Sequence, residues 1–208
     1  MSPLPSRMVD RWRVRGDQLP GEEVLYWHIL LRDHPAVVAL AERAQERLVP
    51  FADGLHFTPL EWLHITTLVV GRPPDDEAQL KMTADVARDL LERADPARVD
   101  VGRVLYHPEA IVLAVEPRDA LARFRSAAQA ATRAVDVHGD VAPWFPHVTV
   151  AYSTADQPAA PIISALGRRL PSASLTLDTL QLVSQVGPER SWNWRVLGEI
   201  PTGGSSGG

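Results

Sequence analysis

The sequence contains one short pattern twice, and each copy lies in a run of residues typical of a β-strand. The copies are His64-Ile65-Thr66 and His147-Val148-Thr149, and β-branched and aliphatic residues surround both. Side chains alternate between the two faces of a strand, so the histidine and the threonine of each copy share a face. A fold that places these strands side by side directs two imidazoles and two hydroxyls into one cleft.

The elements around the two motifs repeat in the same order. Helical periodicity predicts helices over residues 35–49 and 118–135. A predicted strand, over 24–31 or 110–115, precedes each helix, and a motif strand follows it. The two helices start 83 residues apart, as do the two motifs (118 − 35 and 147 − 64). Equal spacing indicates an internal duplication and hence a pseudo-twofold arrangement.

Together the predicted elements indicate an α+β fold. We expect a bilobal molecule of two pseudo-twofold-related lobes, each a mostly antiparallel β-sheet backed by helices, with a central active-site cleft. We expect residues 1–22 to form a flexible N-terminal arm. Residues 23–200 are expected to form a single bilobal domain, and residues 201–208 a flexible Gly/Ser tail. The remaining predicted elements are helices over 76–94 and 161–170 and strands over 99–106, 174–186 and 192–197.

The composition argues against several classes of function. The chain carries 21 Lys and Arg against 26 Asp and Glu, whereas a protein that binds duplex DNA needs a basic surface. It has no cysteine, which excludes disulfides and thiolate sites. Neither a signal peptide nor an apolar run of the roughly 20 residues that a membrane span needs is visible. We expect a monomeric, cytoplasmic protein.

Two histidines and two threonines in one cleft suit acid–base chemistry on a phosphate. With a reference pKa of about 6.5, one imidazole can take a proton from the attacking oxygen while the other protonates the leaving oxygen. A threonine hydroxyl can hydrogen-bond a non-bridging phosphate oxygen. Neither motif has a further ligand at metal-binding spacing, so we expect no metal and no cofactor. One such motif is compatible with an ordinary half-buried strand; two at matching positions favour the functional interpretation.

The runs from Leu63 to Gly71 and from Phe145 to Ala151 resemble the two motifs of the 2H phosphoesterase superfamily, in particular its bacterial 2′-5′ RNA ligase and cyclic phosphodiesterase-like branch. The resemblance extends over about 24–197. It implies metal-independent hydrolysis of the 2′,3′-cyclic phosphate of RNA ends or small nucleotides to a 2′-phosphate. It also implies that His64 and His147 are the acid–base pair, and that Thr66 and Thr149 bind the phosphate.

The sequence departs from the better-known members in two respects. A second threonine, Thr67, follows the first motif, and Val69 stands where an aromatic residue is frequent. The sequence also shows no cluster of basic residues for an RNA backbone. Two alternatives therefore stay open: a 2′-5′ RNA ligase, which needs a basic groove for two RNA ends, and a non-catalytic module that binds nucleotides or RNA ends.

Aromatic and basic residues near the motifs are further candidates for substrate binding. Trp62 and Trp144 precede the motif histidines closely, and either can stack on a base or fill space between the lobes. Arg195 and Arg72 can reach a phosphate or lie in surface ion pairs.

The other histidines and one tyrosine are expected to have structural rather than catalytic roles. In the third His-x-Thr, which begins at His56, a proline follows and makes a central strand unfavourable, so we assign it no catalytic role. We expect His28 to be a packed structural histidine and Tyr152, by its strand parity, to lie in the core. We expect His34, His107 and His138 at surface turns.

Overall fold

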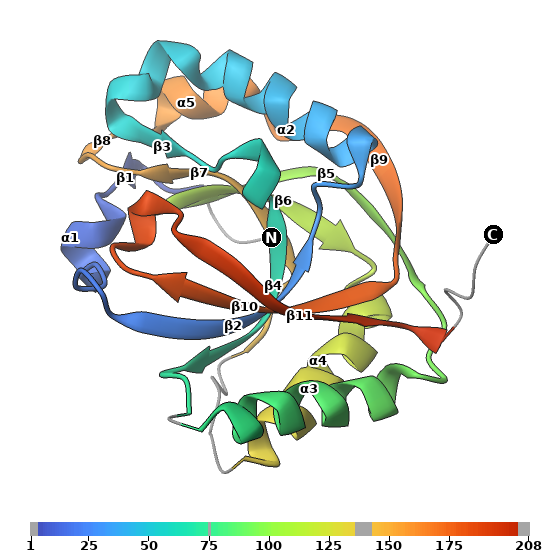
Figure 1. Ribbon diagram of the computed structural model, residues 1–208. Helices are drawn as coiled ribbons and strands as arrows, with labels where there is room; N and C mark the ends of the chain where they lie inside the picture. Colours follow the sequence, from blue (N-terminus) through green and yellow to red (C-terminus); the bar gives the residue numbers. More distant parts are fainter. Residues whose placement is uncertain (1–3, 75, 136–142, 204–208) are drawn as a thin grey trace.

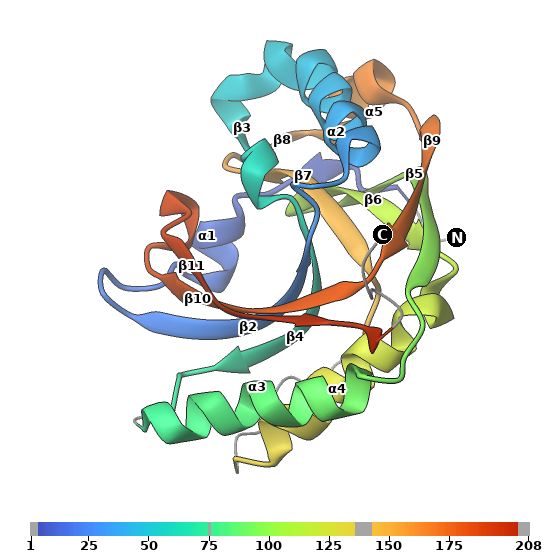
Figure 2. The ribbon, with the colours of Figure 1, turned by 45° about the vertical axis from the view of Figure 1, so that its right-hand side comes forward.

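Antiparallel strands and a small set of helices build the molecule (Figures 1 and 2). The structure is a computed structural model and describes residues 4–74, 76–135 and 143–203. The α-helices are α1 (Arg11–Arg15), α2 (Pro35–Leu48), α3 (Glu77–Leu91), α4 (Ala122–Arg133) and α5 (Ala159–Leu166), and the short 3-10 helices are η1 (Val49–Gly54), η2 (Leu60–Trp62), η3 (Arg118–Leu121) and η4 (Glu189–Ser191). The strands are β1 (Arg7–Met8), β2 (Glu23–Leu30), β3 (Leu55–Phe57), β4 (His64–Gly71), β5 (Ala97–His107), β6 (Ala110–Glu116), β7 (His147–Ser153), β8 (Gln157–Pro158), β9 (Arg169–Leu177), β10 (Thr179–Val186) and β11 (Trp194–Pro201).

Within the described residues, nine strands form one sheet whose two halves meet at the motif strands. The order is β11-β10-β2-β4 in the first half and β7-β6-β5-β9 in the second, and β3 pairs with β7. Every pairing in this sheet is antiparallel. Strands β4 and β7 touch through a single pair, Ile65 with Val148. The predicted α+β architecture with antiparallel sheet and helices is confirmed, and the motif strands are neighbours.

The helices are exchanged between the halves of the sheet. Helix α2, which follows β2, packs against β9 and β7 of the second half, whereas α4, which follows β6, packs against β4 of the first half. Helix α5 lies beside α2 and helix α3 beside α4, so the two helix pairs lie on opposite sides of the molecule (Figure 1). The apolar stripe predicted for α2, Val37 to Leu48, is buried. Each half of the sheet is therefore covered by a helix that follows a strand of the other half.

One predicted strand is wrong. Residues 174–186 form two strands, β9 and β10, which end up at opposite sides of the sheet order. The buried residues switch parity at Asp178, from Leu175 and Leu177 to Leu180 and Leu182, because the chain turns there from one half to the other. The helix predicted over 161–170 ends earlier, at Leu166, and β9 begins at Arg169.

The N-terminal segment differs from the flexible arm predicted for 1–22. Residues 4–22, which we call the N-terminal strap, include β1, which pairs with β8, and helix α1, which Asp10 caps through the amides of Trp12 and Arg13. Met8 and Trp12 are buried, so their apolar surface holds the strap against the body. At the other end of the chain β11 extends to Pro201, and residues 204–208 of the predicted tail lie outside the described residues.

In the part of the chain that the structure describes, no helix is long and apolar enough to span a lipid bilayer.

Candidate active site

A cavity of about 1230 Å³ lies between the two halves of the sheet, and both motifs open into it. Its wall includes His64, Thr66, His147 and Thr149. Because β4 and β7 are adjacent and antiparallel, their motifs reach this cavity from opposite halves. The structure thus brings together the four residues that the sequence predicted as a group.

A bulge in each motif strand adds one more residue to the cavity wall. On β7, Thr149 and Ala151 face Val112 and Ile111 of β6, so Val150 is an extra residue and the alternation shifts. Tyr152 therefore lines the cavity beside Thr149, so it does not point to the opposite face as strand parity predicts. Its predicted place in the core is confirmed, since the side chain is buried in a small apolar cluster with Trp12. On β4 an equivalent extra residue, Thr67, turns Val69 towards the cavity.

The two motif histidines are held in the same way. Nδ1 of His64 lies 2.8 Å from the carbonyl oxygen of Trp62, and Nδ1 of His147 lies 2.7 Å from that of Phe145. A carbonyl oxygen only accepts, so each Nδ1 carries the hydrogen and donates it. In the neutral ring Nε2 then keeps its lone pair, which makes it the atom that can take or return a proton.

Burial controls the charge of both rings. His64 is 7% exposed, and burial lowers its pKa to about 4, opposed by the hydrogen bond to Trp62 and assisted by the charge of His147. The pKa of His147, a half-buried residue, is also lowered, first by burial and then by the positive charges of His107 and Arg11. Both rings are therefore neutral at pH 7 in the free protein, and a bound anion would favour their protonation.

An aromatic wall surrounds His64. The ring centroids of His28 and Trp194 lie 4.4 and 4.9 Å from that of His64, and the rings of His28, Tyr26 and Trp194 stack on one another with centroids 5.0 to 6.5 Å apart. His28 is 1% exposed, and neither of its ring nitrogens has a hydrogen-bond partner among the described residues. The expectation of a packed histidine at this position is confirmed, and the same ring forms part of the cavity wall.

The aromatic and basic candidates near the motifs lie outside the cavity wall. Trp144 donates its Nε1 hydrogen to the carbonyl oxygen of Thr66 over 2.8 Å and so ties the segment before β7 to β4. Trp62 packs against Trp194 at 5.5 Å. The Arg195 side chain is 73% exposed and lies 3.8 Å from Glu23, which is a surface ion pair. None of these three residues, nor Arg72, is part of the described wall.

The remaining histidines have varied surroundings. His56 on β3 accepts a hydrogen bond from Nε1 of Trp192 over 2.9 Å, and Trp192 lines the cavity, so His56 supports the rim. His34 is half-buried before α2, and His107 is exposed at the end of β5, where it lines the cavity. His138 lies outside the described residues.

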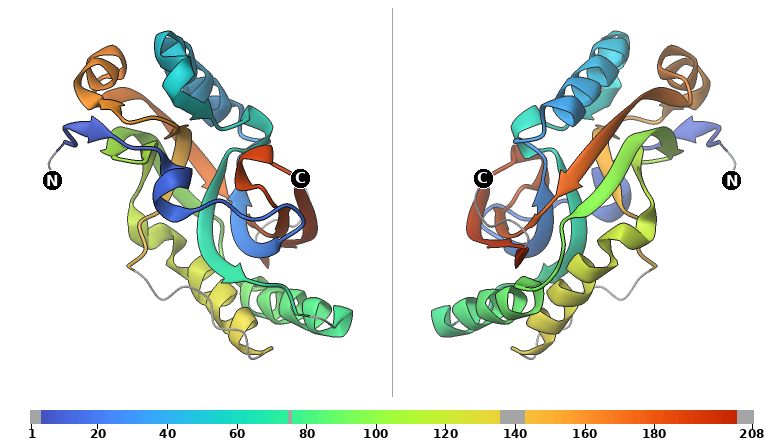
Figure 3. Two further views of the ribbon diagram at one scale, coloured as in Figure 1. Left: turned by 90° about the vertical axis from the view of Figure 1, so that its left-hand side faces the viewer. Right: turned by 90° about the vertical axis from the view of Figure 1, so that its right-hand side faces the viewer.

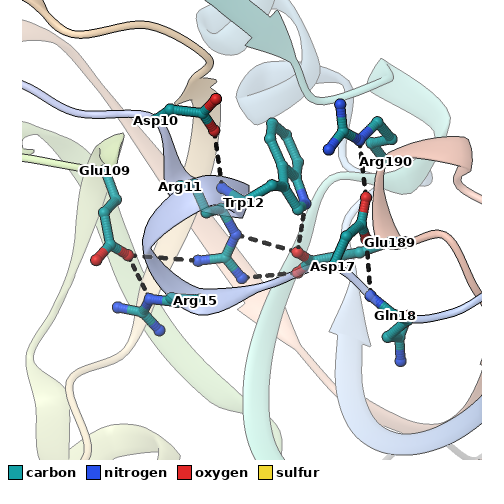
Figure 4. A network of polar contacts seen from close by, with 9 residues as sticks. All are labelled: Asp10, Arg11, Trp12, Arg15, Asp17, Gln18, Glu109, Glu189 and Arg190. Carbon is teal, nitrogen blue, oxygen red and sulfur yellow. Dashed lines mark hydrogen bonds and ion pairs between the residues drawn. The ribbon is translucent and has the colours of Figure 1, made fainter.

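The N-terminal strap contributes an ionic group that the sequence analysis missed (Figure 4). Arg11 forms two hydrogen bonds with Glu189, of 3.1 and 2.7 Å, and lies 3.9 Å from Glu109, which also binds Arg15. Glu189 follows β10 and Glu109 precedes β6, so Arg11 joins the two halves of the sheet. The strap crosses in front of the sheet in the left view of Figure 3. Asp10 before an apolar-flanked helix was the sequence signal for this packed segment.

A basic cluster is also present, contrary to the expectation from the sequence. Arg103, Arg118, Arg168 and Arg169, which we call the arginine cluster, all line the cavity. They come from β5, η3 and the start of β9, so no run of basic residues marks them in the sequence. The mildly acidic net charge of the whole chain, −5, conceals this local excess of positive charge.

The described residues contain no group of three or more His, Asp or Glu side chains that could hold a metal ion.

The fold and the site define a class of protein: two antiparallel half-sheets that meet at paired His-x-Thr strands are the architecture of the 2H phosphoesterases. Residues 28–189 match the family model described as the 2′-5′ RNA ligase superfamily. The chain belongs to this superfamily. No curated protein sequence matches the chain.

Solved structures share the fold over most of their length. TT0787 of Thermus thermophilus is 23% identical with a TM-score of 0.65, covering 88% of this chain and 99% of that chain. LigT of E. coli in complex with 3′-AMP is 12% identical with a TM-score of 0.63, covering 86% of this chain and 97% of that chain. The MHV ns2 PDE domain is 16% identical with a TM-score of 0.58, covering 80% of this chain and 99% of that chain.

Proposed function

We propose that the protein is a phosphodiesterase that hydrolyses the 2′,3′-cyclic phosphate of RNA ends or small nucleotides to a 2′-phosphate. The observation that carries this proposal is the pair of imidazoles in one cavity, each with Nδ1 bound to a backbone carbonyl and Nε2 left for proton transfer. Thr66 and Thr149 line the same cavity and supply hydroxyl donors for the non-bridging oxygens. LigT, which shares the fold, has been solved with a nucleotide, 3′-AMP.

The reaction needs one base, one acid and a site for the charge that develops on phosphorus. A water oxygen attacks the phosphorus and gives its proton to one histidine while the bond from phosphorus to the 3′ oxygen breaks. The other histidine protonates the 3′ oxygen, which leaves a 3′ hydroxyl and a 2′-phosphate. Threonine hydroxyls stabilise the charge of the five-coordinate phosphorus. No step in this sequence requires a group beyond the two motifs.

The surroundings of the two rings favour different roles for them. His64 is the more deeply buried ring, and a pKa of about 4 keeps it neutral, which suits the base. His147 is less buried and so loses less solvation when protonated, which suits the acid. We assign the base to His64 and the acid to His147 on this ground.

The test is hydrolysis of 2′,3′-cyclic nucleotides in EDTA by the wild type, His64→Ala and His147→Ala. Each variant is expected to lose about 10²–10⁴ in kcat/KM. The product should be the 2′-phosphate, identified by chromatography against both isomers. If the wild type hydrolyses neither mononucleotides nor RNA ends with a cyclic phosphate, the non-catalytic binding module becomes the favoured alternative. Turnover that survives both substitutions would contradict the roles of the histidines.

Threonine substitutions test the phosphate site with a matched control inside the chain. We expect Thr66→Val and Thr149→Val each to lower kcat/KM by roughly 10- to 100-fold, because each removes one hydroxyl donor from the reacting phosphate. Thr58 belongs to the third His-x-Thr, does not line the cavity, and has a buried hydroxyl without a hydrogen-bond partner among the described residues. Thr58→Val should therefore leave kcat/KM unchanged, and an equal loss in all three variants would contradict the assignment.

The arginine cluster favours a second candidate, a 2′-5′ RNA ligase. This activity needs basic surface to hold two RNA ends, which the cluster supplies on one side of the motifs. Incubating two RNA fragments, one with a cyclic phosphate and one with a free 5′ hydroxyl, tests it directly. A joined product with a 2′-5′ linkage supports the ligase; hydrolysis without joining supports the phosphodiesterase.

A further inference from the structure

We infer that the arginine cluster is a second phosphate subsite, which binds the phosphodiester upstream of the reacting nucleotide. The preferred substrate is then the 3′ end of an RNA chain rather than a free cyclic nucleotide. This inference rests on the proposed function. The terminal nucleotide of an RNA chain is joined through its 5′ oxygen to a further phosphate, whereas a 2′,3′-cyclic mononucleotide has no second phosphate. A second anion subsite therefore distinguishes the two substrates.

The register of the strands places the cluster at the His147 end of the cavity. His147 pairs with Ala114 on β6, and β6 ends two residues later at Glu116. Arg118 opens η3 directly after this end, while Arg103 of β5 pairs with Arg169 of β9. Three separate segments thus converge on the same part of the wall, beyond the reacting phosphate.

Aromatic stacking connects this cluster to the catalytic ring. The guanidinium carbon of Arg118 lies 4.0 Å from the ring centroid of Phe145, and that ring stacks on His147 at 6.2 Å. Arg118 is therefore held in place by the residue whose carbonyl oxygen orients His147. A positive charge is fixed next to the acid rather than left on a freely moving side chain.

The charge at this end of the cavity is not balanced by carboxylates of the wall. Among the described residues of the wall, the carboxylates are Glu109 and Glu189, and both belong to the strap contacts around Arg11. Glu116 lies beside the cluster, 2.7 Å from Arg103, which lowers its pKa. Among the described residues Glu116 is the carboxylate that lies beside Arg103, Arg118 and Arg169, so these three guanidinium groups keep a net positive charge that suits an anionic ligand.

The opposite end of the same strands is closed by the N-terminal strap. Tyr152, at the far end of β7, pairs with Ala110, next to Glu109. There Arg11 bridges Glu109 and Glu189 and lies over the Tyr152 ring at 4.5 Å. An RNA chain that places its terminal phosphate between the histidines therefore leaves over the arginine cluster and not past the strap.

The experiment compares substrates that differ only in the charge of one linkage. The first is a dinucleotide with a 2′,3′-cyclic phosphate and an ordinary internal phosphodiester; the second carries a neutral methylphosphonate at that linkage; 2′,3′-cyclic AMP is the reference. We expect kcat/KM of the wild type at low salt to be about tenfold higher for the charged dinucleotide than for the neutral one. The ratio should fall as salt rises.

Single-charge variants locate the effect. Arg169→Gln and Arg118→Gln are each expected to reduce the charged-to-neutral ratio several-fold, and the double variant to bring it close to one. Arg43→Gln removes the same charge from an exposed position on α2, away from the cavity wall, and should keep the wild-type ratio. Because the ratio compares two substrates on one protein, a general loss of activity or folding cancels.

The outcomes separate this inference from the proposed function. A wild-type ratio near one, with both dinucleotides and cyclic AMP hydrolysed, overturns the subsite and leaves the phosphodiesterase standing. The same holds if Arg43→Gln lowers the ratio as much as Arg169→Gln, since the effect is then long-range charge alone. If no cyclic phosphate is hydrolysed at all, the proposed function fails and the subsite falls with it.

Discussion

The rings of His28 and Trp194 pack against His64 and determine how this histidine responds to acid. His28 and His64 lie with ring centroids 4.4 Å apart and Trp194 packs on both, so a proton on either histidine is poorly solvated. Burial is the main cause that lowers the pKa of both rings; a charge on His64 further opposes protonation of His28, and a charge on His147 opposes protonation of His64. The neutral pair is therefore the stable form of the folded protein.

The stability of the fold is expected to fall as pH decreases from 7 to 5. His64 has a pKa of about 4 when folded and 6.5 ordinarily, so in this interval the unfolded chain binds more protons than the folded protein and is stabilised relative to it. The loss from His64 alone is on the order of 2 kcal/mol, and His28 adds to it. Urea unfolding at both pH values measures it.

A variant identifies the histidine responsible for this pH dependence. His64→Gln should remove most of its share of the loss between pH 7 and 5, whereas His34→Gln, at the half-buried start of α2, should not. Carboxylates whose pKa is lowered, such as Glu116, lose their contribution only at lower pH and do not interfere. A free energy of unfolding that is equal at pH 5 and pH 7 would contradict the burial of a neutral His64.

Single residues of the site differed in how far the sequence could place them. The four motif residues were found because each pair obeys the simple alternation of a strand. Tyr152 was assigned to the wrong face because a bulge depends on the register with β6, which no local pattern shows. The arginine cluster could not be found either, since Arg103, Arg118 and the adjacent pair Arg168 and Arg169 are far apart in the chain, and the pairing of β5 with β6 and β9 brings them together.

At the scale of elements, the N-terminal strap is the part of the molecule that acts on both halves of the sheet. It precedes residues 28–189, which match the family model. Backbone hydrogen bonds join it to both sides. The amide of Val9 donates to Pro108 and that of Ala159 to Ser6, on the side of the second half, while the amide of Gly187 donates to Glu22 on the side of the first half. Trp12 adds a hydrogen bond of 2.9 Å to Glu189. The strap thus fixes the distance between the two hairpin ends that border the cavity.

Arg11→Ala is expected to lower the free energy of unfolding by about 2 kcal/mol. The substitution leaves the half-buried carboxylate of Glu189 without its bidentate partner, which costs more than the loss of a surface pair. Arg13 lies two residues away on α1, its side chain is 60% exposed, and it pairs with the exposed Asp156. Arg13→Ala should therefore change stability by no more than about 1 kcal/mol.

A double-mutant cycle between Arg11 and Glu189 separates their pairing from other effects of the substitutions. We expect the Arg11→Ala and Glu189→Gln variants to be non-additive, because each removes the same ion pair. Urea unfolding of the wild type, the two single variants and the double variant supplies the coupling free energy. Additive losses would mean that the ion pair does not hold the strap, and that its buried apolar side chains and backbone hydrogen bonds do so.

The elements themselves were largely predictable, with one instructive failure. Helix α2 and its buried stripe follow from periodicity, as does the order strand–helix–motif strand in both repeats. Strands β9 and β10 were predicted as one strand because residues typical of strands continue on both sides of Asp178, with no proline or glycine between them. The change of parity there was visible, but only the three-dimensional order shows that it separates the two outermost regions of the sheet.

For the whole molecule, the two halves of the sheet are joined mainly by packing of the helices and only to a small extent by pairing between strands. Strands β4 and β7 share one residue pair, Ile65 with Val148. By contrast α2 covers β9 and β7, α4 covers β4, and α3 packs along α4 and against β11. One continuous cluster of buried apolar residues runs through both halves. The exchange of helices means that neither half encloses a core by itself.

The chain is therefore expected to unfold in a single cooperative transition, and its separate repeats should not fold. Urea curves followed by the fluorescence of the six tryptophans and by far-ultraviolet circular dichroism should coincide. A fragment of residues 1–96, which ends before β5, keeps β2, β4, α2 and α3 but lacks the strands that α2 covers and the α4 partner of α3. It exposes both apolar helix faces to water, and its circular dichroism should show a largely unfolded chain. A folded fragment with a cooperative transition of its own, or two separated transitions in the full chain, would show instead that the halves are independent and that the exchanged helices contribute little to their union.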